Sequence, residues 1–135
     1  EKEIFAVKYL VDTDVLINVL RGKARFDKEI IESGASISII TLGELVYGAF
    51  KSSHPQIGLQ STEGFLKEAG FHLINLSEEI IYTFGEIKAT LEVKGQRLED
   101  FDLLIGATAK VSDLILVTGN LRHFKRIKGL KVQSV

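Results

Sequence analysis

Three acidic side chains stand where the chain passes into a helical stretch. Asp12 directly follows the apolar residues YLV, Glu44 comes shortly after a β-branched run, and Asp102 opens a helical pattern. Carboxylates that converge at one place repel one another unless protons or cations compensate them. Oxygen ligands without His or Cys favour a hard cation, Mg²⁺ or Mn²⁺, over zinc. Such an ion would activate water against a phosphodiester, as in a nuclease, or equally against a phosphomonoester, as in a phosphatase.

Each of these acids also has a purely structural explanation. Asp12 is a favoured N-cap for the helical run Val15–Leu20. Thr41 and Glu44 fit a capping box, in which the glutamate bonds back to the backbone of the cap residue. Asp102 could serve only to start its own helix. The hydrolytic interpretation therefore depends on the three carboxylates meeting in the folded protein.

Alternating apolar runs and helical patterns predict the elements that carry these acids. Continuous apolar runs indicate buried strands at 8–11, 37–40, 71–76 and 114–117, and a possible fifth strand at 130–135. Apolar residues at helical steps indicate helices at 15–20, 24–33, 42–51, 59–69, between Ser77 and Gly95, and at 102–110. The helix at 24–33 would carry Phe26, Ile30 and Ile31 on one side. This alternation predicts an α/β protein with a mainly parallel sheet covered by helices on both faces.

Parallel sheets bind their ligands beyond the carboxyl ends of the strands. That rule selects the residues after the first strand, Asp12 and Asp14, and those after the fourth, Thr118 and Asn120. The Thr118 hydroxyl could orient a ligand or a phosphate, or it could simply satisfy the backbone at the strand end.

Composition limits the remaining function classes. At 135 residues the chain suffices for one folded domain, and the absence of cysteine excludes thiol catalysis and thiolate zinc sites. No apolar run approaches the roughly 20 residues that span a bilayer, so we expect a cytoplasmic protein with no membrane association. The chain contains no methionine, so we expect that processing or trimming exposed its first residue.

A net charge of −1 gives the chain no overall attraction for nucleic acid, so RNA binding would need a local basic face. One basic cluster follows Asn120 and contains Arg122, Lys125, Arg126, Lys128 and Lys131. We consider Arg122, Lys125 and Arg126 as contacts for RNA phosphates, although a solvated surface commonly explains such a run. Lys94 and Arg97 are secondary candidates.

The histidines and aromatic residues suggest no further chemistry. His54, His72 and His123 lack the spacing of metal ligands, and we expect them to be structural or exposed. Tyr47 and Phe65 fall at helical spacing with other apolar residues. That spacing favours core packing or an interface over stacking on bases.

Four segments, in this order, resemble the signature segments of PIN domains, especially the toxin subunits of VapBC-type modules: YLVDTDVLI, TLGELVYGA, LEDFDLLIGATA and LILVTGNLRHFKRIKGLKV. The resemblance runs from about Lys8 to Val132 within a single domain, 1–135. It implies a five-stranded parallel sheet sandwiched by helices, and an endoribonuclease that uses Mg²⁺ or Mn²⁺ to cleave RNA. It also implies a homodimer and a small antitoxin protein that blocks the acidic groove.

Carried over by position, the resemblance assigns metal binding and catalysis to Asp12, Glu44 and Asp102. The family's fourth position is often Asp, but here it is Asn120, which keeps a carbonyl oxygen and loses the charge. Asn120 is therefore expected to hydrogen-bond or to orient water during catalysis, and binding of a second metal stays open. The auxiliary candidates are Asp14, Asp100 and Thr118.

Two other functions stay open at this point. The segment VDTDVL also resembles the first motif of haloacid-dehalogenase-like phosphohydrolases, with one Asp as nucleophile and the next as acid and base. The last clear strand ends in Thr-Gly-Asn rather than in that family's acidic pair, and Glu44 would have no role. The other alternative is a non-catalytic PIN-like RNA-binding or assembly module, which Asn120 keeps open.

Overall fold

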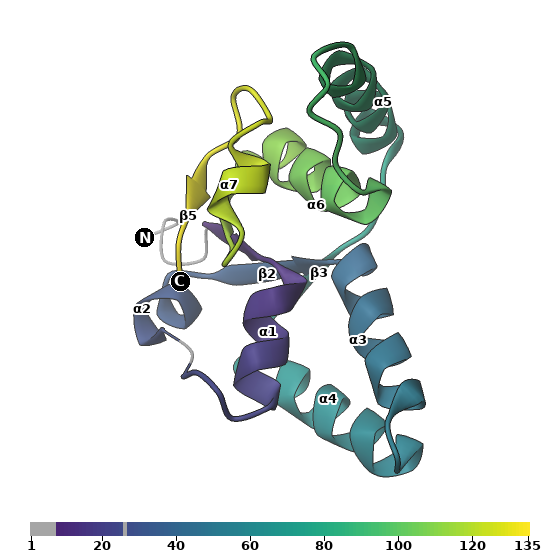
Figure 1. Cartoon of the computed structure of the whole chain (residues 1–135). Helices are drawn as coiled ribbons and strands as arrows, with labels where there is room; N and C mark the ends of the chain where they lie inside the picture. Colours follow the sequence, from purple (N-terminus) through teal and green to yellow (C-terminus); the bar gives the residue numbers. More distant parts are fainter. Residues whose placement is uncertain (1–7, 26) are drawn as a thin grey trace.

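A sheet of five parallel strands runs through the middle of the protein (Figure 1). The computed structural model describes residues 8–25 and 27–135. The strands are β1 (Tyr9–Val11), β2 (Ala35–Ser38), β3 (His72–Ile74), β4 (Ile115–Val117) and β5 (Val132–Gln133). They lie in the order β3-β2-β1-β4-β5. The predicted parallel sheet is confirmed, although its strands are somewhat shorter than the apolar runs from which they were predicted.

Helices cover both faces of this sheet, as predicted (Figure 1). On one face lie α1 (Thr13–Leu20), α2 (Lys28–Glu32), α3 (Ile39–Lys51) and α4 (Pro55–Ala69). On the other face lie α5 (Glu78–Val93), α6 (Asp100–Val111) and α7 (Leu121–Phe124). No helix of the described part of the chain is long and apolar enough to cross a membrane.

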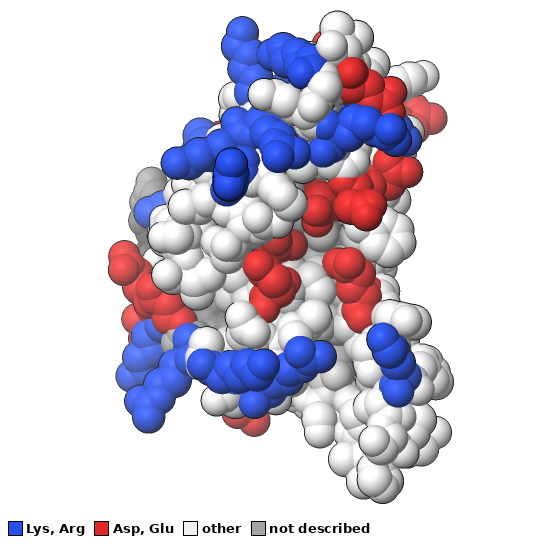
Figure 2. Space-filling view, viewed as in Figure 1, with Lys and Arg blue, Asp and Glu red and all other residues white. Residues whose placement is uncertain are grey.

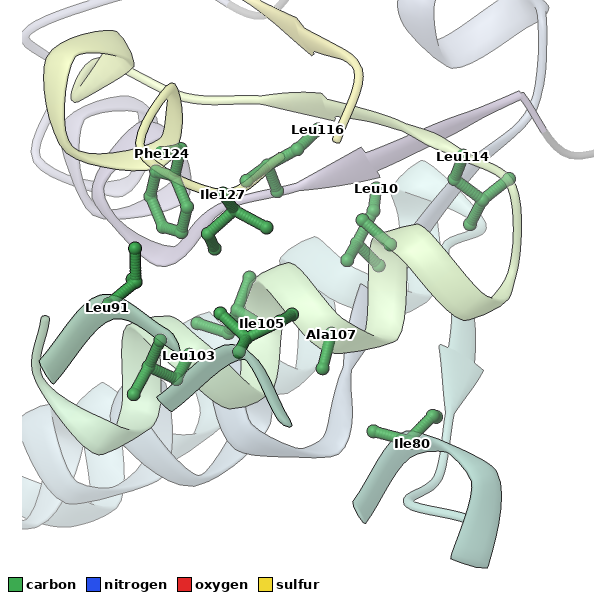
Figure 3. Close-up of a cluster of buried hydrophobic side chains, with 12 residues drawn as sticks. Leu10, Ile80, Leu91, Leu103, Ile105, Ala107, Leu114, Leu116, Phe124 and Ile127 are labelled. Atoms are coloured by element: carbon green, nitrogen blue, oxygen red, sulfur yellow. The ribbon is translucent and has the colours of Figure 1, made fainter. Parts of the chain in front are cut away.

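Alternation along the central strand divides the interior into two cores. Tyr9 and Val11 face α1 and α3, where they pack with Leu16 and Leu45. Leu10 faces the opposite way and joins the core beneath α5 and α6, which Figure 3 shows in close-up. Because β1 is buried on both faces, it reads in the sequence as an unbroken apolar run. This burial anchors the end of β1, where the first acid stands.

The second predicted strand, 37–40, is partly wrong. The strand ends at Ser38, and Ile39 already begins α3, because the Ser38 hydroxyl accepts a hydrogen bond from the Thr41 backbone N–H at 3.0 Å. A capping hydroxyl at this point starts the helix despite the β-branched residues that follow. Thr41 is therefore inside the helix, and the predicted capping box of Thr41 and Glu44 is wrong.

Other boundaries differ from the predictions because caps define them. The helix predicted at 24–33 is reduced to α2, which Asp27 caps by accepting from the Glu29 N–H at 2.9 Å. Phe26, predicted on this helix, lies outside the described residues. Pro55 starts α4 earlier than predicted, at a position that suits the fixed φ of proline. The Ser77 cap of α5 is confirmed, and α7 was not predicted.

The chain reverses its direction across the sheet between β1 and β4. After β1 it adds β2 and then β3 on one side, and it then returns through α5 and α6 to add β4 and β5 on the other. Connections that leave two neighbouring strands in opposite directions open a crevice at the strands' carboxyl ends. Asp12 and Thr118 directly follow these two strands.

Candidate active site

Asp12 is fixed across the crevice between β1 and β4. Its backbone N–H donates to the carbonyl of Val117 at 2.9 Å, which extends the pairing of the two strands. One carboxylate oxygen accepts from the Thr118 hydroxyl at 2.8 Å, and the other accepts from the Thr13 backbone N–H at 2.8 Å. Asp12 also caps α1, with only 5% of its surface exposed. Capping and a chemical role are therefore compatible in this residue.

The environment of Asp12 favours its neutral form. The pKa of Asp12 is raised to about 7, first by burial, then by the nearby charge of Asp14 and least by the charge of Asp102. The hydrogen bonds from Thr118 and Thr13 act in the opposite direction, since they stabilise the charged form. A buried carboxylate with acidic neighbours is one that a bound cation would stabilise strongly.

Asp14 has one carboxylate oxygen in place and one without a partner. Its Oδ2 accepts from the Gly119 backbone N–H at 3.2 Å. A Cβ atom at Gly119 would lie 2.8 Å from this oxygen, so the glycine permits the approach. Its Oδ1 is buried, and no hydrogen-bond partner for it occurs among the described residues. A buried oxygen of this kind is costly unless a proton or a cation satisfies it.

Glu44 turns toward α1 and away from the start of its own helix. Its Oε1 accepts from the Thr13 hydroxyl at 2.5 Å. Thr13 also contacts the Thr41 hydroxyl at 3.0 Å, and Thr41 contacts Ser38 at 3.4 Å. A row of hydroxyl groups therefore connects Glu44 to the end of β2. Glu44 therefore does not cap the start of its own helix.

Asp102 completes the acidic group from the start of α6. Burial raises the pKa of Asp102, and the negative charge of Glu44 raises it next, with smaller contributions from Glu99 and Asp14. The His123 ring lowers the pKa of Asp102, so the imidazole also lies near this carboxylate. Figure 2 shows acidic side chains gathered in the middle of this face of the protein. The fold thus brings together acids that are up to 90 positions apart in the sequence, from Asp12 to Asp102.

The oxygen donors suit a hard cation, although within residues 8–25 and 27–135 no three acidic or imidazole groups already form a metal cage. Mg²⁺ usually keeps several of its waters and takes only one or two protein carboxylates directly. The unpartnered oxygen of Asp14 and the raised pKa of Asp12 both indicate negative charge that lacks compensation. The residues present therefore fit Mg²⁺ or Mn²⁺ better than zinc.

Asn120 and His123 form a pair beside the acids. The backbone N–H of Asn120 donates to the Thr118 hydroxyl at 2.9 Å, and its side-chain nitrogen lies 2.7 Å from Nδ1 of His123. Asn120 donates in this contact when the imidazole carries its proton on Nε2. No chemical role was predicted for His123 from the sequence. Its only signal was the spacing of three residues from Asn120 on α7, a helix that was not predicted.

The remaining candidate residues lie around the rim. Asp100 pairs with Lys88 at 2.9 Å, and both side chains are substantially exposed. Arg126 donates to the backbone carbonyl of Arg97 at 3.1 Å, so part of its guanidinium serves the protein itself. Exposed Arg122 and Lys125 belong to the basic cluster around α7, and Figure 2 shows a band of basic side chains on that side of the acids.

Residues 9–130 match the PIN domain family. The chain belongs to this family. The resemblance of the four sequence segments is thereby confirmed, and family membership favours a nuclease over the haloacid-dehalogenase-like alternative. This PIN domain is 33% identical over 131 residues to the tRNA(fMet)-specific endonuclease VapC of Salmonella typhimurium, with 95% of this chain and 98% of the relative covered. It is 38% identical to Ribonuclease VapC1 of Methanocaldococcus jannaschii, with 93% and 86% covered.

Solved structures share the fold of this PIN domain over nearly its whole length. DNA-bound VapBC from Salmonella typhimurium gives a TM-score of 0.87 at 32% identity, covering 96% of this chain and 98% of the other. VapBC2 from Rickettsia felis, bound to a DNA fragment from its promoter, gives 0.87 at 27% identity, covering 96% and 99%. The predicted α/β fold with a five-stranded parallel sheet is therefore confirmed.

Proposed function

We propose that this PIN domain is an endoribonuclease that requires Mg²⁺ or Mn²⁺ and acts as the toxin of a VapBC-type toxin–antitoxin pair. The observation that carries the proposal is the acidic cluster: buried Asp12 has a raised pKa, Asp14 has a buried oxygen without a partner among the described residues, and Glu44 and Asp102 lie beside them. Relatives at 33% and 38% identity bear the names endonuclease and ribonuclease. Both point to RNA phosphodiesters as the substrate.

The acids would hold the ion, with Asp12, Glu44 and Asp102 as its main ligands and Asp14 as an auxiliary one. When bound, the ion would lower the pKa of a water molecule and neutralise charge on the scissile phosphate. The protein's own contribution is positioning. Hydrogen bonds from Thr118 and Thr13 hold carboxylates before substrate arrives, which limits the rearrangement needed for reaction.

Asn120 and His123 would act on the substrate side of the acids. Asn120 is anchored through its backbone to Thr118, and its amide is hydrogen-bonded to the imidazole. In this arrangement Asn120 is a polar group that orients water or a phosphate oxygen, and it adds no negative charge against RNA. Arg122, Lys125 and Arg126 would attract RNA phosphates toward this side. The proposed location is the cytoplasm, where an RNA substrate is available.

An antitoxin protein and a second copy of this chain are the proposed partners. The similar VapBC structures support the antitoxin, which would inhibit the toxin by covering the acidic cluster. A homodimer is supported by exposed apolar side chains that follow one another from β3 into α5, namely Leu73, Leu76, Ile81 and Tyr82. Light scattering of the purified chain would measure its mass in solution and so test the dimer.

Incubation with structured and unstructured RNAs tests the proposed activity. We expect cleavage by the wild type with Mg²⁺ or Mn²⁺, none with EDTA, and none by Asp102→Asn. Equal cleavage by the variant would point to a contaminant or to another site.

In parallel, Mn²⁺ should raise the melting temperature of the wild type but not of Asp12→Asn, since a ligand of the folded state stabilises it. If Mn²⁺ stabilises the protein and no RNA is cut, a non-catalytic RNA-binding module becomes the better description.

A further inference from the structure

A groove of about 890 Å³ begins at the acidic cluster and follows one side of α3. The groove-facing residues of this helix recur at steps of three and four, as one helical face requires: Ile40, Gly43, Glu44, Tyr47, Gly48 and Lys51. The facing wall comes from α1 and from the start of α6, through Thr13, Ile17, Arg21 and Phe101. Glu44 thus belongs to the acidic cluster and to the groove at once. What enters this groove lies beside the site of hydrolysis.

Two glycines keep the floor of the groove open. Gly43 and Gly48 lie inside α3, where glycine is unfavourable compared with alanine. A Cβ atom at either position would meet nothing within 4 Å, so the packing of the described residues does not require glycine there. Both face the groove, and a larger side chain would fill it. The space they leave is available to a ligand.

Aromatic and cationic side chains are both presented along this groove. Tyr47 is 64% exposed and Phe101 is 53% exposed, and both rings line the groove. Tyr47 is therefore not a core residue, and of its two predicted roles only an interface fits this exposure, whereas Phe65 packs against Phe71 with ring centroids 6.0 Å apart. The groove is lined mainly by apolar groups, and the two exposed rings in it offer a surface on which a base can stack.

The two cations lie at the far part of the groove from the acids. Lys51 is two helical turns beyond Glu44, roughly 10 Å along α3, and Arg21 follows the end of α1. Both are exposed, and within the described part of the chain neither forms an ion pair. The ammonium of Lys51 lies over the Tyr47 ring, 5.7 Å from its centroid. Figure 2 shows basic side chains below the acidic cluster as well as above it, so acids lie between cations on both sides. Neither Arg21 nor Lys51 was among the basic residues predicted from the sequence to contact RNA.

We propose that this groove binds an unpaired nucleotide of the RNA next to the bond that is cut. Its base stacks on Phe101 and Tyr47, and its phosphate contacts Arg21 and Lys51. The inference rests on the proposed ribonuclease function and adds to it a binding subsite for one nucleotide. An unpaired nucleotide has a base that can stack on the aromatic rings of the groove and a phosphate that can bind its cations. A purely apolar peptide segment would offer no anionic partner to Arg21 and Lys51.

The test is binding of two fluorescent RNA oligomers of equal length, one ordinary and one with abasic central nucleotides. Anisotropy is measured in EDTA, so that binding is observed whether or not the protein hydrolyses RNA. We expect wild type to bind the ordinary oligomer more tightly. Phe101→Ala and Tyr47→Ala should each weaken that binding by about five- to 150-fold and leave the abasic oligomer unaffected. Loss of Arg21 and Lys51, as Gln, should weaken both.

Two further variants provide a control and a way to block the groove. Phe50→Ala removes a ring that is 59% exposed on the same helix but does not line the groove, so it should bind like wild type. Gly48→Leu leaves both aromatic rings in place, improves helix propensity and fills the floor. It should fold with an unchanged or higher melting temperature and lose the preference for the ordinary oligomer.

Three outcomes would overturn the proposal. One is equal binding of both oligomers by wild type, and another is an effect of Phe101→Ala no larger than that of Phe50→Ala. The third is a set of variants that keep RNA affinity but lose binding of an antitoxin, which would make the groove a protein-docking surface. Base-dependent binding without any cleavage in Mg²⁺ would instead contradict the proposed hydrolysis and support the nucleotide subsite.

Discussion

Two acids of the cluster, Asp12 and Asp102, are held in different ways. Asp12 follows the central strand, is 5% exposed, and both of its carboxylate oxygens accept hydrogen bonds. Asp102 lies on the first turn of α6, is partly exposed, and its carboxylate has no hydrogen-bond partner among the described residues. Asp12 at the sheet edge is therefore held in one position, whereas the Asp102 side chain on the helix is free to adjust. A site divided in this way can preorganise one ligand and still adapt to substrate.

The largest expected effect is on cleavage. Asp12→Asn and Asp102→Asn should each lower kcat/KM for RNA by at least about 100-fold, more than the loss of a supporting residue usually costs. Their effects on stability should differ. In EDTA at neutral pH, Asp12→Asn should raise the melting temperature because it removes a buried charge, whereas Asp102→Asn should change it less. Full activity of Asp12→Asn would disprove its role as a ligand.

The stability of the metal-free protein should fall as pH rises from about 4 to about 7. The pKa of Asp12 is raised to about 7 in the folded protein from 3.8, so in this interval the folded state binds more protons than the unfolded state. Stability then decreases with pH, by on the order of a few kcal/mol, and levels off above pH 7.

Urea unfolding at several pH values in EDTA measures this slope. Asp12→Asn should flatten it, and Mn²⁺ should stabilise the wild type more at pH 8 than at pH 5. If the stability of the wild type is unchanged or rises over this interval, the pKa of Asp12 is not raised in the folded protein.

Loss of the hydroxyl that holds Asp12 should have a smaller effect. Thr118→Val removes the donor to Asp12 and the acceptor for the Asn120 N–H, and should lower the free energy of unfolding by about 1–3 kcal/mol. Thr108→Val is the matched control, because Thr108 is equally buried but its hydroxyl bonds only to the Leu104 carbonyl within its own helix. Equal losses in the two variants would show that the bond to Asp12 has no special value.

The smallest effect is expected at Asp100. Its pairing with Lys88 lies at the surface, and such pairs contribute little. Asp100→Asn should change the free energy of unfolding by less than about 0.5 kcal/mol and leave RNA cleavage close to that of wild type. A large loss of cleavage would instead make Asp100 a working member of the acidic cluster.

Much of the fold was predictable because burial marks the strands directly. YLV and LILV are continuous apolar runs since their strands are covered on both faces, and the residues after them had to emerge at one edge. The predictions failed where a local hydrogen bond decided the boundary. Ser38 ended a β-branched run, and α7 is too short for any periodicity to appear.

The sequence by itself determined the strand runs, the acids that follow them and the absence of sulfur ligands. The tertiary structure alone decided where those acids turn. Because α3 starts at Ile39 rather than at Leu42, Glu44 lies more than one turn inside the helix, and its carboxylate accepts from Thr13 on α1 instead of capping its own helix. The nearness of His123 to Asp102, and the groove between α1 and α3, likewise depend on how elements distant in sequence pack together.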